Sequence, residues 1–480
     1  MQPQTESLAQ IFTEYASNVL FECADGRKVM YADVLELGGG VALRETTRRL
    51  VFCMCENEPG GLAGYLSLLL ARAVPFMLNA GLSSAQILPL VDAYRPGFIW
   101  LPQSRAAEFS RAQCLLEYDG YSLLWLNSRE QQIHNTLALL LSTSGSTGSP
   151  KFVRLSHENI LSNARSIVQY LQLSPEEVPI TTLSPSYTYG LSIIHSHVLM
   201  GAKIALTSNT FFDRNFWDFL KTIRATSFGG VPYHYEILKK LGFTKMGLPS
   251  LRTLTQAGGR MEAELTREYA THCARQGMRF FTMYGQVEAT ARVAYLPAEK
   301  AVEKSGSIGI AVPGGKLWIE NEQGQIQEGA AAAGELVYQG PNVSMGYAQG
   351  YEDLGLGDEH RGVLRTGDLA RRDADGDYYI VGRLKRFLKL FGQRVNLQDV
   401  EDWLAKAGHV VACAGRDDQL EIYLPHGLIE MAKDIKLAVV QHLKVAPSAV
   451  KVIAIIDFPR SVTGKIQFTE LSSRAGETLA

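Results

Sequence analysis

The segment LALLLSTSGSTGSPK, residues 137–151, gives the strongest indication of the architecture of this chain. Its first five residues are apolar and bounded by turn-forming residues, which predicts a short buried strand. The hydroxyls and glycines that follow leave the backbone free to curl around an anion, with the charge of Lys151 nearby. A Walker loop is excluded, because two residues separate the glycine from Lys151 and Phe152 follows it. The segment is therefore either a phosphate-binding loop of another kind or a surface turn without a ligand.

Length and composition indicate a globular protein with more than one domain. The chain has 480 residues, which exceeds the size of one ordinary core. Hydrophobic residues make up 46% and charged residues 20%, as is typical of globular proteins. The net charge of −2 gives no electrostatic basis for binding nucleic acid or an anionic membrane surface.

The cysteines and the chain's N-terminal residues favour a cytoplasmic protein. The first twelve residues lack a charged region followed by an apolar run, so we expect no signal peptide. Residues 63–82 are the most apolar segment, but Arg72, Pro75 and Asn79 interrupt it, which predicts a core helix and its exit, not a membrane span. No pair of cysteines has the spacing of a zinc or redox motif, so we expect small buried side chains in a reducing compartment at Cys23, Cys53, Cys55, Cys114, Cys273 and Cys413.

Up to about Gly285, short apolar runs alternate with longer amphipathic segments. This alternation predicts the α/β class, with layered subdomains and largely parallel strands. Ser156 is the predicted N-cap of the first helix in this region. The expected strands are 179–183, 204–207, 226–229, 251–256 and 279–283, and the expected helices are 157–171, 191–200, 215–225, 233–241 and 261–276.

After Thr290 the sequence changes to short alternating strands separated by glycine-rich turns. The pair Asp375-Gly376 is a hairpin signal within this β-rich subdomain, which we expect at about 291–384. Residues 1–384 are thus predicted to form a large N-terminal domain, and residues 385–480 a small, mobile α+β domain. In the small domain we expect a helix at 397–407, a hairpin at 410–424, a helix at 429–443 and a strand at 450–456.

Four further segments carry residue types suited to a nucleotide. QAGGR (256–260) is a strand-to-helix turn, and MYGQVEAT (283–290) offers a ring that can stack on a base and a carboxylate that can hold a metal. LRTGDLARRDADGDYYIVGR (364–383) contains a carboxylate able to accept both hydroxyls of a ribose, and PRSVTGKIQ (459–467) contains a lysine. Each has an ordinary alternative, because Tyr284 can lie in the core, Glu288 can begin a helix, Asp368 can bind its own turn and Lys465 can be solvated.

Taken in order, these segments resemble the signatures of the AMP-forming adenylating superfamily, which comprises acyl-CoA synthetases, luciferases and peptide-synthetase adenylation domains. The matching segments run from residue 137 to residue 467, roughly two thirds of the chain, and residues 1–130 are compatible with the family. The phrases EATARVAYLP and GRLKRFLKLFGQRVNLQDVE look like a compact bacterial subgroup of acyl-AMP ligases.

The resemblance implies a role for each matching residue. Lys465 is the implied catalytic lysine, Glu288 the magnesium ligand, Lys385 the hinge between the domains, and Gly392 the glycine of the loop that admits the thiol. The implied phosphate-binding residues are Thr143, Ser144, Gly145, Ser146, Thr147, Gly148 and Lys151. The implied adenine-binding residues are Gly258, Gly259, Arg260, Met283, Tyr284, Gly285 and Gln286, and the ribose-binding residues are Asp368 and Arg383.

Two features bear on the identity of the acid substrate and on the efficiency of adenylation. The family usually has a threonine where Val287 stands, and a valine cannot donate its hydrogen bond to the α-phosphate. SPSYTYGLS (184–192) matches the aromatic motif of the acyl pocket, although the same pattern fits a packing cluster. Amino-acid-activating relatives carry an aspartate near here; this sequence does not, so an acid without an α-ammonium group is favoured. The candidate pocket residues are Tyr187, Thr188 and Tyr189, with Gly229, Gly230 and Tyr233 opposite.

The resemblance implies two half-reactions that use ATP and Mg²⁺. A carboxylate joined to AMP gains a phosphate monoester as its leaving group, which a thiol can displace. The implied function is an acyl- or aryl-CoA synthetase acting on a small carboxylic acid, as a monomer or homodimer. A ligase that loads the phosphopantetheine of an acyl carrier protein, and a lapsed nucleotide-binding homologue, are the alternatives.

Overall fold

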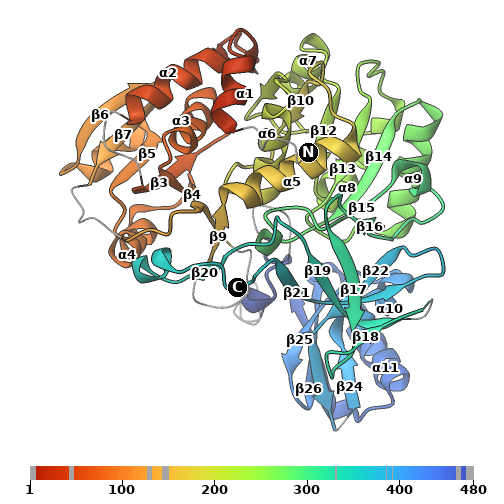
Figure 1. The fold of residues 1–480 in the computed structure, drawn as a ribbon. Coiled ribbons are helices and arrows are strands. Elements are labelled where there is room, and N and C mark those ends of the chain that lie inside the picture. Colours follow the sequence, from red (N-terminus) through yellow and green to blue (C-terminus); the bar gives the residue numbers. More distant parts are fainter. Residues whose placement is uncertain are drawn as a thin grey trace. The chain divides into compact units, whose positions relative to one another are not determined.

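The computed structural model describes residues 7–42, 48–126, 132–142, 151–329, 332–384, 386–391, 393–460 and 466–471 (Figure 1). The chain divides into two compact units. The first comprises Met1–Gly145, Ser149–Lys316 and Tyr338–Leu364, and the second comprises Ser146–Gly148, Leu317–Val337 and Arg365–Ala480. The boundary expected between residues 384 and 385 stays a prediction.

The first unit contains two large sheets in its described residues (Figure 1). The eight-stranded sheet has the order β20 (Gly346–Ala348), β9 (Phe152–Ser156), β8 (Leu137–Ser142), β4 (Val74–Asn79), β3 (Leu50–Cys55), β5 (Phe98–Pro102), β7 (Tyr121–Trp125) and β6 (Gln113–Tyr118). The nine-stranded sheet has the order β16 (Ile310–Ala311), β15 (Ala294–Leu296), β14 (Arg279–Tyr284), β13 (Thr253–Gln256), β12 (Ser227–Gly230), β10 (Pro179–Thr181), β11 (Ile204–Leu206), β1 (Val19–Cys23) and β2 (Lys28–Met30). The central strands of both sheets are parallel, as predicted.

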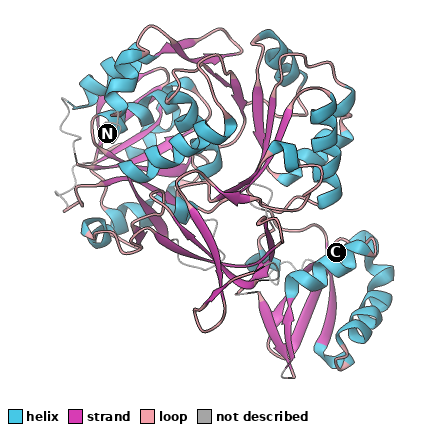
Figure 2. Ribbon diagram, turned by 45° about the vertical axis from the view of Figure 1, so that its right-hand side comes forward, coloured by secondary structure: helices cyan, strands magenta, loops and turns pink. Residues whose placement is uncertain are grey.

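Helices lie on both faces of these sheets (Figure 2). They are α1 (Leu8–Glu14), α2 (Tyr31–Ala42), α3 (Pro59–Leu70), α4 (Ser84–Tyr94), α5 (His157–Leu171), α6 (Thr188–Val198), α7 (Arg214–Thr222), α8 (Pro232–Lys240) and α9 (Ala263–Arg275). Strand β3 shows why the central strands are apolar throughout. Phe52 packs in a core with residues of α4, whereas Cys53 packs in a core shared with α3 and α6. A third core joins the nine-stranded sheet to α7, α8 and α9.

The predicted elements of this unit are confirmed, with ends shifted by up to three residues. Helix α5 has the predicted bounds, and its N-cap Ser156 accepts a hydrogen bond from the backbone N–H of Asn159 at 3.1 Å. The core helix expected within residues 63–82 is confirmed as α3, and the segment after it contains strand β4, which was not predicted. The region after Thr290 is also less separate than expected, since β15, β16 and β20 extend the two large sheets.

The second unit contains smaller sheets. A five-stranded sheet has the order β18 (Ile326–Gln327), β17 (Lys316–Glu320), β19 (Ala333–Gln339), β21 (Val363–Arg372) and β22 (Tyr378–Arg383). Strands β23 (Phe387–Leu390) and β24 (Gln393–Asn396) form a pair. Strands β25 (Ala412–Arg416), β26 (Gln419–Pro425) and β27 (Val450–Ile455) share a core with α10 (Leu397–Lys406) and α11 (Ala432–Leu443). These elements confirm the predicted α+β module.

The predicted Asp375-Gly376 turn joins β21 to β22. Gly376 has a φ of +87°, a left-handed conformation that glycine adopts at little cost. The Asp373 carboxylate accepts hydrogen bonds from the backbone N–H groups of Asp375 and Asp377, at 3.1 and 2.9 Å. The turn therefore fixes the register of β21, which contains the T-G-D segment, against β22.

Four of the six cysteines are buried, as expected, but Cys114 is exposed and Cys23 is half-buried. Cys114 is exposed because it lies on β6, at the edge of the eight-stranded sheet. Within the described ranges, no helix has both the length and the apolar character needed to cross a membrane.

Candidate active site

The predicted phosphate-binding loop connects two paired strands. Ser142 at the end of β8 lies opposite Phe152 at the start of β9, so the residues that flank the loop lie side by side. Lys151 is exposed beside Phe152. The other predicted residues of this loop, Thr143 to Gly148, lie outside the described residues, as do Lys385, Gly392 and Lys465.

Glu288 lies on the 3₁₀ turn Val287–Ala289 that follows β14. The hydroxyl of Tyr347 donates a hydrogen bond to Oε1 of Glu288 at 2.9 Å. Burial and the neighbouring Glu288 charge raise the pKa of Tyr347, so its hydroxyl stays protonated and remains a donor. The ammonium of Lys151 lies 5.8 Å from the centroid of the Tyr347 ring, within the range of a cation–π contact. Tyr347 therefore connects the predicted metal ligand to the predicted phosphate-binding lysine.

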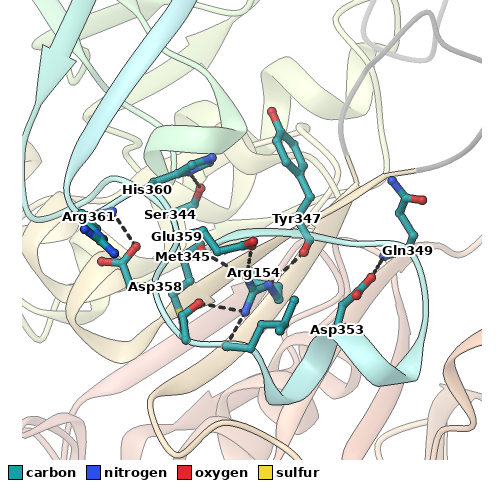
Figure 3. A network of polar contacts seen from close by, with 12 residues as sticks. Arg154, Ser344, Met345, Tyr347, Gln349, Asp353, Asp358, Glu359, His360 and Arg361 are labelled. Carbon is teal, nitrogen blue, oxygen red and sulfur yellow. Dashed lines mark hydrogen bonds and ion pairs between the residues drawn. The ribbon is translucent and has the colours of Figure 1, made fainter.

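A buried arginine holds the segment that carries Tyr347 (Figure 3). Arg154 on β9 is fully buried, and its guanidinium donates to the backbone carbonyl of Tyr347 at 2.9 Å and to that of Met345 at 3.1 Å. It also binds the carbonyl of Leu356 and pairs with the carboxylate of Glu359. Antiparallel pairing of β20 with β9 adds to this hold, and together these contacts fix the position of Tyr347.

A second set of hydrogen bonds holds the turn that carries Glu288. The side-chain amide of Asn342 donates to the carbonyls of Ala289 and Arg292, both at 2.9 Å, and Tyr338 donates to its Oδ1 at 2.7 Å. Thr290 has a φ of +64° and donates to the carbonyl of Asn342 at 2.7 Å. Asn342 is only 2% exposed, so these hydrogen bonds are shielded from water.

The predicted adenine-binding residues lie at two strand ends. Gly285 is required by close packing, because a Cβ there would lie 1.6 Å from the carbonyl oxygen of Ala291. Gln286 donates to the hydroxyl of Tyr284 at 3.0 Å, and both side chains are half-buried. Met283 is buried, whereas Gly259 and Arg260 are exposed after β13.

Val287, which replaces the family's usual threonine, is 9% exposed and packs in the large core of the first unit. An aliphatic side chain there contributes packing and offers no hydrogen bond to a phosphate.

Some of the predicted acyl-pocket residues are buried and packed, whereas Tyr233 is exposed. The hydroxyl of Tyr187 lies against Gly258, because a Cβ added to Gly258 would be 2.2 Å from the Tyr187 hydroxyl oxygen. Tyr189 is 1% exposed, and its hydroxyl donates a hydrogen bond to the carbonyl of Thr255 at 2.8 Å. Tyr189 and the buried Thr188 therefore also serve as packing residues. Gly229 leaves room for the Tyr189 hydroxyl, whereas Tyr233 on α8 is 41% exposed.

The predicted ribose-binding residues lie together in the second unit. Asp368 on β21 pairs in register with Arg383 on β22, and their side chains form an ion pair at 2.8 Å. The Asp368 side chain is 3% exposed and that of Arg383 is 62% exposed. The pair presents a carboxylate held by an arginine, a group that can accept hydrogen bonds from vicinal hydroxyls.

The residues of the first unit suit a magnesium ion bound mainly by phosphate. Among the described residues, no three His, Cys, Asp or Glu side chains cluster as a metal site. Tyr347 donates to one oxygen of the half-buried Glu288, and in the described part of the chain no hydrogen bond reaches the other oxygen. Mg²⁺ commonly takes one or two protein carboxylates together with phosphate oxygens and water, so a single glutamate fits it.

The chain is similar in sequence to several known enzymes. The chain is 26% identical to a luciferin 4-monooxygenase of Luciola mingrelica, over 75% of this chain and 67% of that protein. It is 27% identical to an oxalate–CoA ligase of Arabidopsis thaliana, over 69% of this chain and 66% of the relative. The matches thus span about two thirds of the relatives' own lengths.

Among solved structures, the o-succinylbenzoate CoA synthetase of Bacillus subtilis, in complex with ATP and magnesium, superimposes with a TM-score of 0.75. It is 20% identical in sequence, and the match covers 96% of this chain and 99% of that chain. The fold is therefore that of an adenylating enzyme, and the predicted α/β class is confirmed. Residues 30–348 match the family described as AMP-binding enzyme. The chain belongs to this family.

Proposed function

We propose that this enzyme joins a carboxylic acid to AMP from ATP, releases pyrophosphate, and transfers the acyl group to a thiol, that of CoA. The observation that carries the proposal is the position of Glu288, held by Tyr347 on the turn after β14, in a chain of the AMP-binding family. CoA is favoured as acceptor by the oxalate–CoA ligase relative. The alternative acceptor is the phosphopantetheine of an acyl carrier protein.

In this proposal the chain's own residues divide the chemistry. Tyr284 and the backbone of Gly258 and Gly259 bind adenine, and the Asp368–Arg383 pair binds the ribose. Thr143 to Gly148 and Lys151 hold the phosphates, and Lys465 stabilises the charge that develops during acyl-AMP formation. Mg²⁺, held by Glu288, would neutralise charge on the phosphate oxygens. Binding of Mg²⁺ would use the oxygen of the Glu288 carboxylate to which Tyr347 does not donate.

The second half-reaction needs a different set of groups at the same acyl-AMP. We propose that the small domain, residues 385–480, turns about Lys385, so that Lys465 leaves and the segment of Gly392 enters with the thiol. Such a movement allows one site to serve two reactions in sequence.

ATP–pyrophosphate exchange with a panel of carboxylic acids tests the first step. We expect exchange that depends on the acid and on Mg²⁺. Release of AMP that requires CoA would support the CoA acceptor, and turnover only with a phosphopantetheinylated carrier protein would support the alternative. Absence of exchange with every acid would support the lapsed homologue and contradict the proposal.

We expect Tyr347→Phe to weaken magnesium use. The change removes one hydrogen bond to a charged oxygen, and the loss of about 1.4 kcal/mol is a tenfold change in an equilibrium constant. The Mg²⁺ concentration for half-maximal exchange should rise about tenfold, with a smaller change in KM for the acid. Tyr351→Phe, which alters a tyrosine of the same segment that bonds Glu352, is the matched control. An unchanged Mg²⁺ dependence would contradict the role of Tyr347.

We expect Asp368→Asn to raise KM for ATP about 10- to 100-fold, with less effect on kcat. The change removes a charged acceptor and leaves Arg383 without its partner. Glu328→Gln, which changes an exposed carboxylate of the same unit, should leave KM unchanged. A loss of kcat alone would place Asp368 in catalysis instead of ATP binding.

A further inference from the structure

Arg292 is a buried cation fixed from two sides. It follows the Glu288 turn, and its backbone carbonyl accepts hydrogen bonds from Asn163 at 3.0 Å and from Asn342 at 2.9 Å. The residue is 3% exposed, and its guanidinium lies 4.1 Å from the centroid of the Tyr189 ring. These hydrogen bonds fix the backbone from which the Arg292 side chain extends inside the first unit.

The charge of Arg292 has no anionic partner in the described part of the chain. No described carboxylate lies within 4.0 Å of its guanidinium, and its Nε is buried without a hydrogen-bond acceptor. The buried Glu177 instead accepts a hydrogen bond from Thr226. The Tyr170 side chain is a hydrogen-bond partner of Arg292, and burial raises the pKa of Tyr170, Tyr187 and Tyr189 to about 12, so these neighbours are neutral at pH 7.

An arginine cannot lose its proton in a protein, and burying its charge without an anion is unfavourable. The face of Tyr189 compensates for part of this cost through a cation–π contact. A carboxylate compensates far better, because a guanidinium can bind it through two parallel hydrogen bonds. The environment of Arg292 therefore favours an anionic ligand group.

Arg292 lines a cavity of ≈ 20 Å³ between α5, α6 and strands β10, β12 and β13. The size suits one small group and not the body of a substrate. His197 lines the same cavity and is 3% exposed, and its Nε2 has no hydrogen-bond partner. The other polar lining residues are the hydroxyl residues Ser192, Ser196, Ser227, Thr253 and Thr255.

A second cavity shares lining residues with this one. The two share Ile167 and Ser192, and the second is lined by Thr290 and Ala291, which lie beside the Glu288 turn. Arg292 lies four positions after Glu288 in the sequence, so their Cα atoms are at most ~14 Å apart. One carboxylate of a short acid is the kind of single small group that the cavity beside Arg292 can hold.

We propose that the acid substrate is a dicarboxylic acid, whose second carboxylate ion-pairs with Arg292 in this cavity while the first is adenylated. The inference rests on the proposed function and specifies its substrate class. Arg292 is then a specificity-determining residue that contacts substrate without taking part in the chemical step.

Pyrophosphate exchange with dicarboxylic acids and their monomethyl esters tests the inference, because each pair differs in one charge. For the wild type we expect kcat/KM to be about 100-fold higher for the diacid. Arg292→Met should remove this preference by lowering diacid activity about 100-fold while leaving the monoester within threefold, and Arg292→Lys should retain part of it. The diacid should also raise the Tm of the wild type but not of Arg292→Met.

Arg279→Met is the control, since Arg279 contacts Thr253 from outside the cavity lining and its loss should leave the preference unchanged. Equal use of diacid and monoester by the wild type, or equal losses for both in Arg292→Met, would overturn the inference and leave the proposed function intact. Exchange with no acid at all would overturn the proposed function and the inference with it. If Arg292→Met does not fold, the Arg292→Lys variant and the wild-type preference decide the outcome.

Discussion

Lys465→Ala should abolish acyl-AMP formation while sparing transfer from supplied acyl-AMP to the thiol. A preorganised ammonium stabilises the charge that develops as the acid oxygen attacks the α-phosphate, and removing such a group costs ~10²–10³-fold or more in rate. In the second half-reaction the proposed domain movement takes Lys465 away from the site. Exchange of pyrophosphate measures the first step, and thioester formation from synthetic acyl-AMP measures the second.

Lys451→Ala is the matched control for this experiment, because Lys451 is an exposed lysine on β27 of the same unit. It should leave both half-reactions unchanged. Equal losses in the two half-reactions of Lys465→Ala would contradict the proposal that one domain presents two faces.

Glu288→Gln should lower kcat for pyrophosphate exchange by ~10²–10³-fold, the scale seen when one stabiliser of transition-state charge is lost. The amide retains the size of the side chain and an oxygen that can accept the hydrogen bond of Tyr347, so the fold of the turn should persist. What it loses is the negative charge that Mg²⁺ requires. Titration with Mg²⁺ should show a higher half-saturation concentration, and excess Mg²⁺ should recover part of the activity.

Glu303→Gln removes an exposed carboxylate of the same unit and should have no effect. Magnesium dependence equal to that of the wild type in Glu288→Gln would show that another group holds the ion.

The elements that the sequence could predict are those determined by local pattern. Helix α5 has its predicted bounds because Ser156 and the amphipathic residues after it act within a few positions along the chain. Asp368 and Arg383 come together because a short hairpin turn aligns two strands that are adjacent in sequence. The carboxylate after β14 was likewise predicted from its motif.

The residues that the sequence did not reveal act over long separations. Arg154 and Tyr347 are 193 positions apart, and Asn342 is 53 positions from Ala289. Nothing in a local pattern pairs such residues, although an arginine within the apolar strand β9 was an available signal. Arg292 was equally hidden, because its significance lies in the absence of a nearby described carboxylate.

The amide of Asn342 has a consequence for altering this enzyme by design. The Asn342 side chain donates to the backbone carbonyl of Ala289, which follows the proposed magnesium ligand Glu288, and to that of Arg292, the residue proposed to select the acid. Substitutions along that tethered backbone would disturb turnover and choice of acid together. To change the choice of acid without changing turnover, substitutions would therefore have to be made among the side chains around the Arg292 guanidinium, and Asn342 would have to be kept.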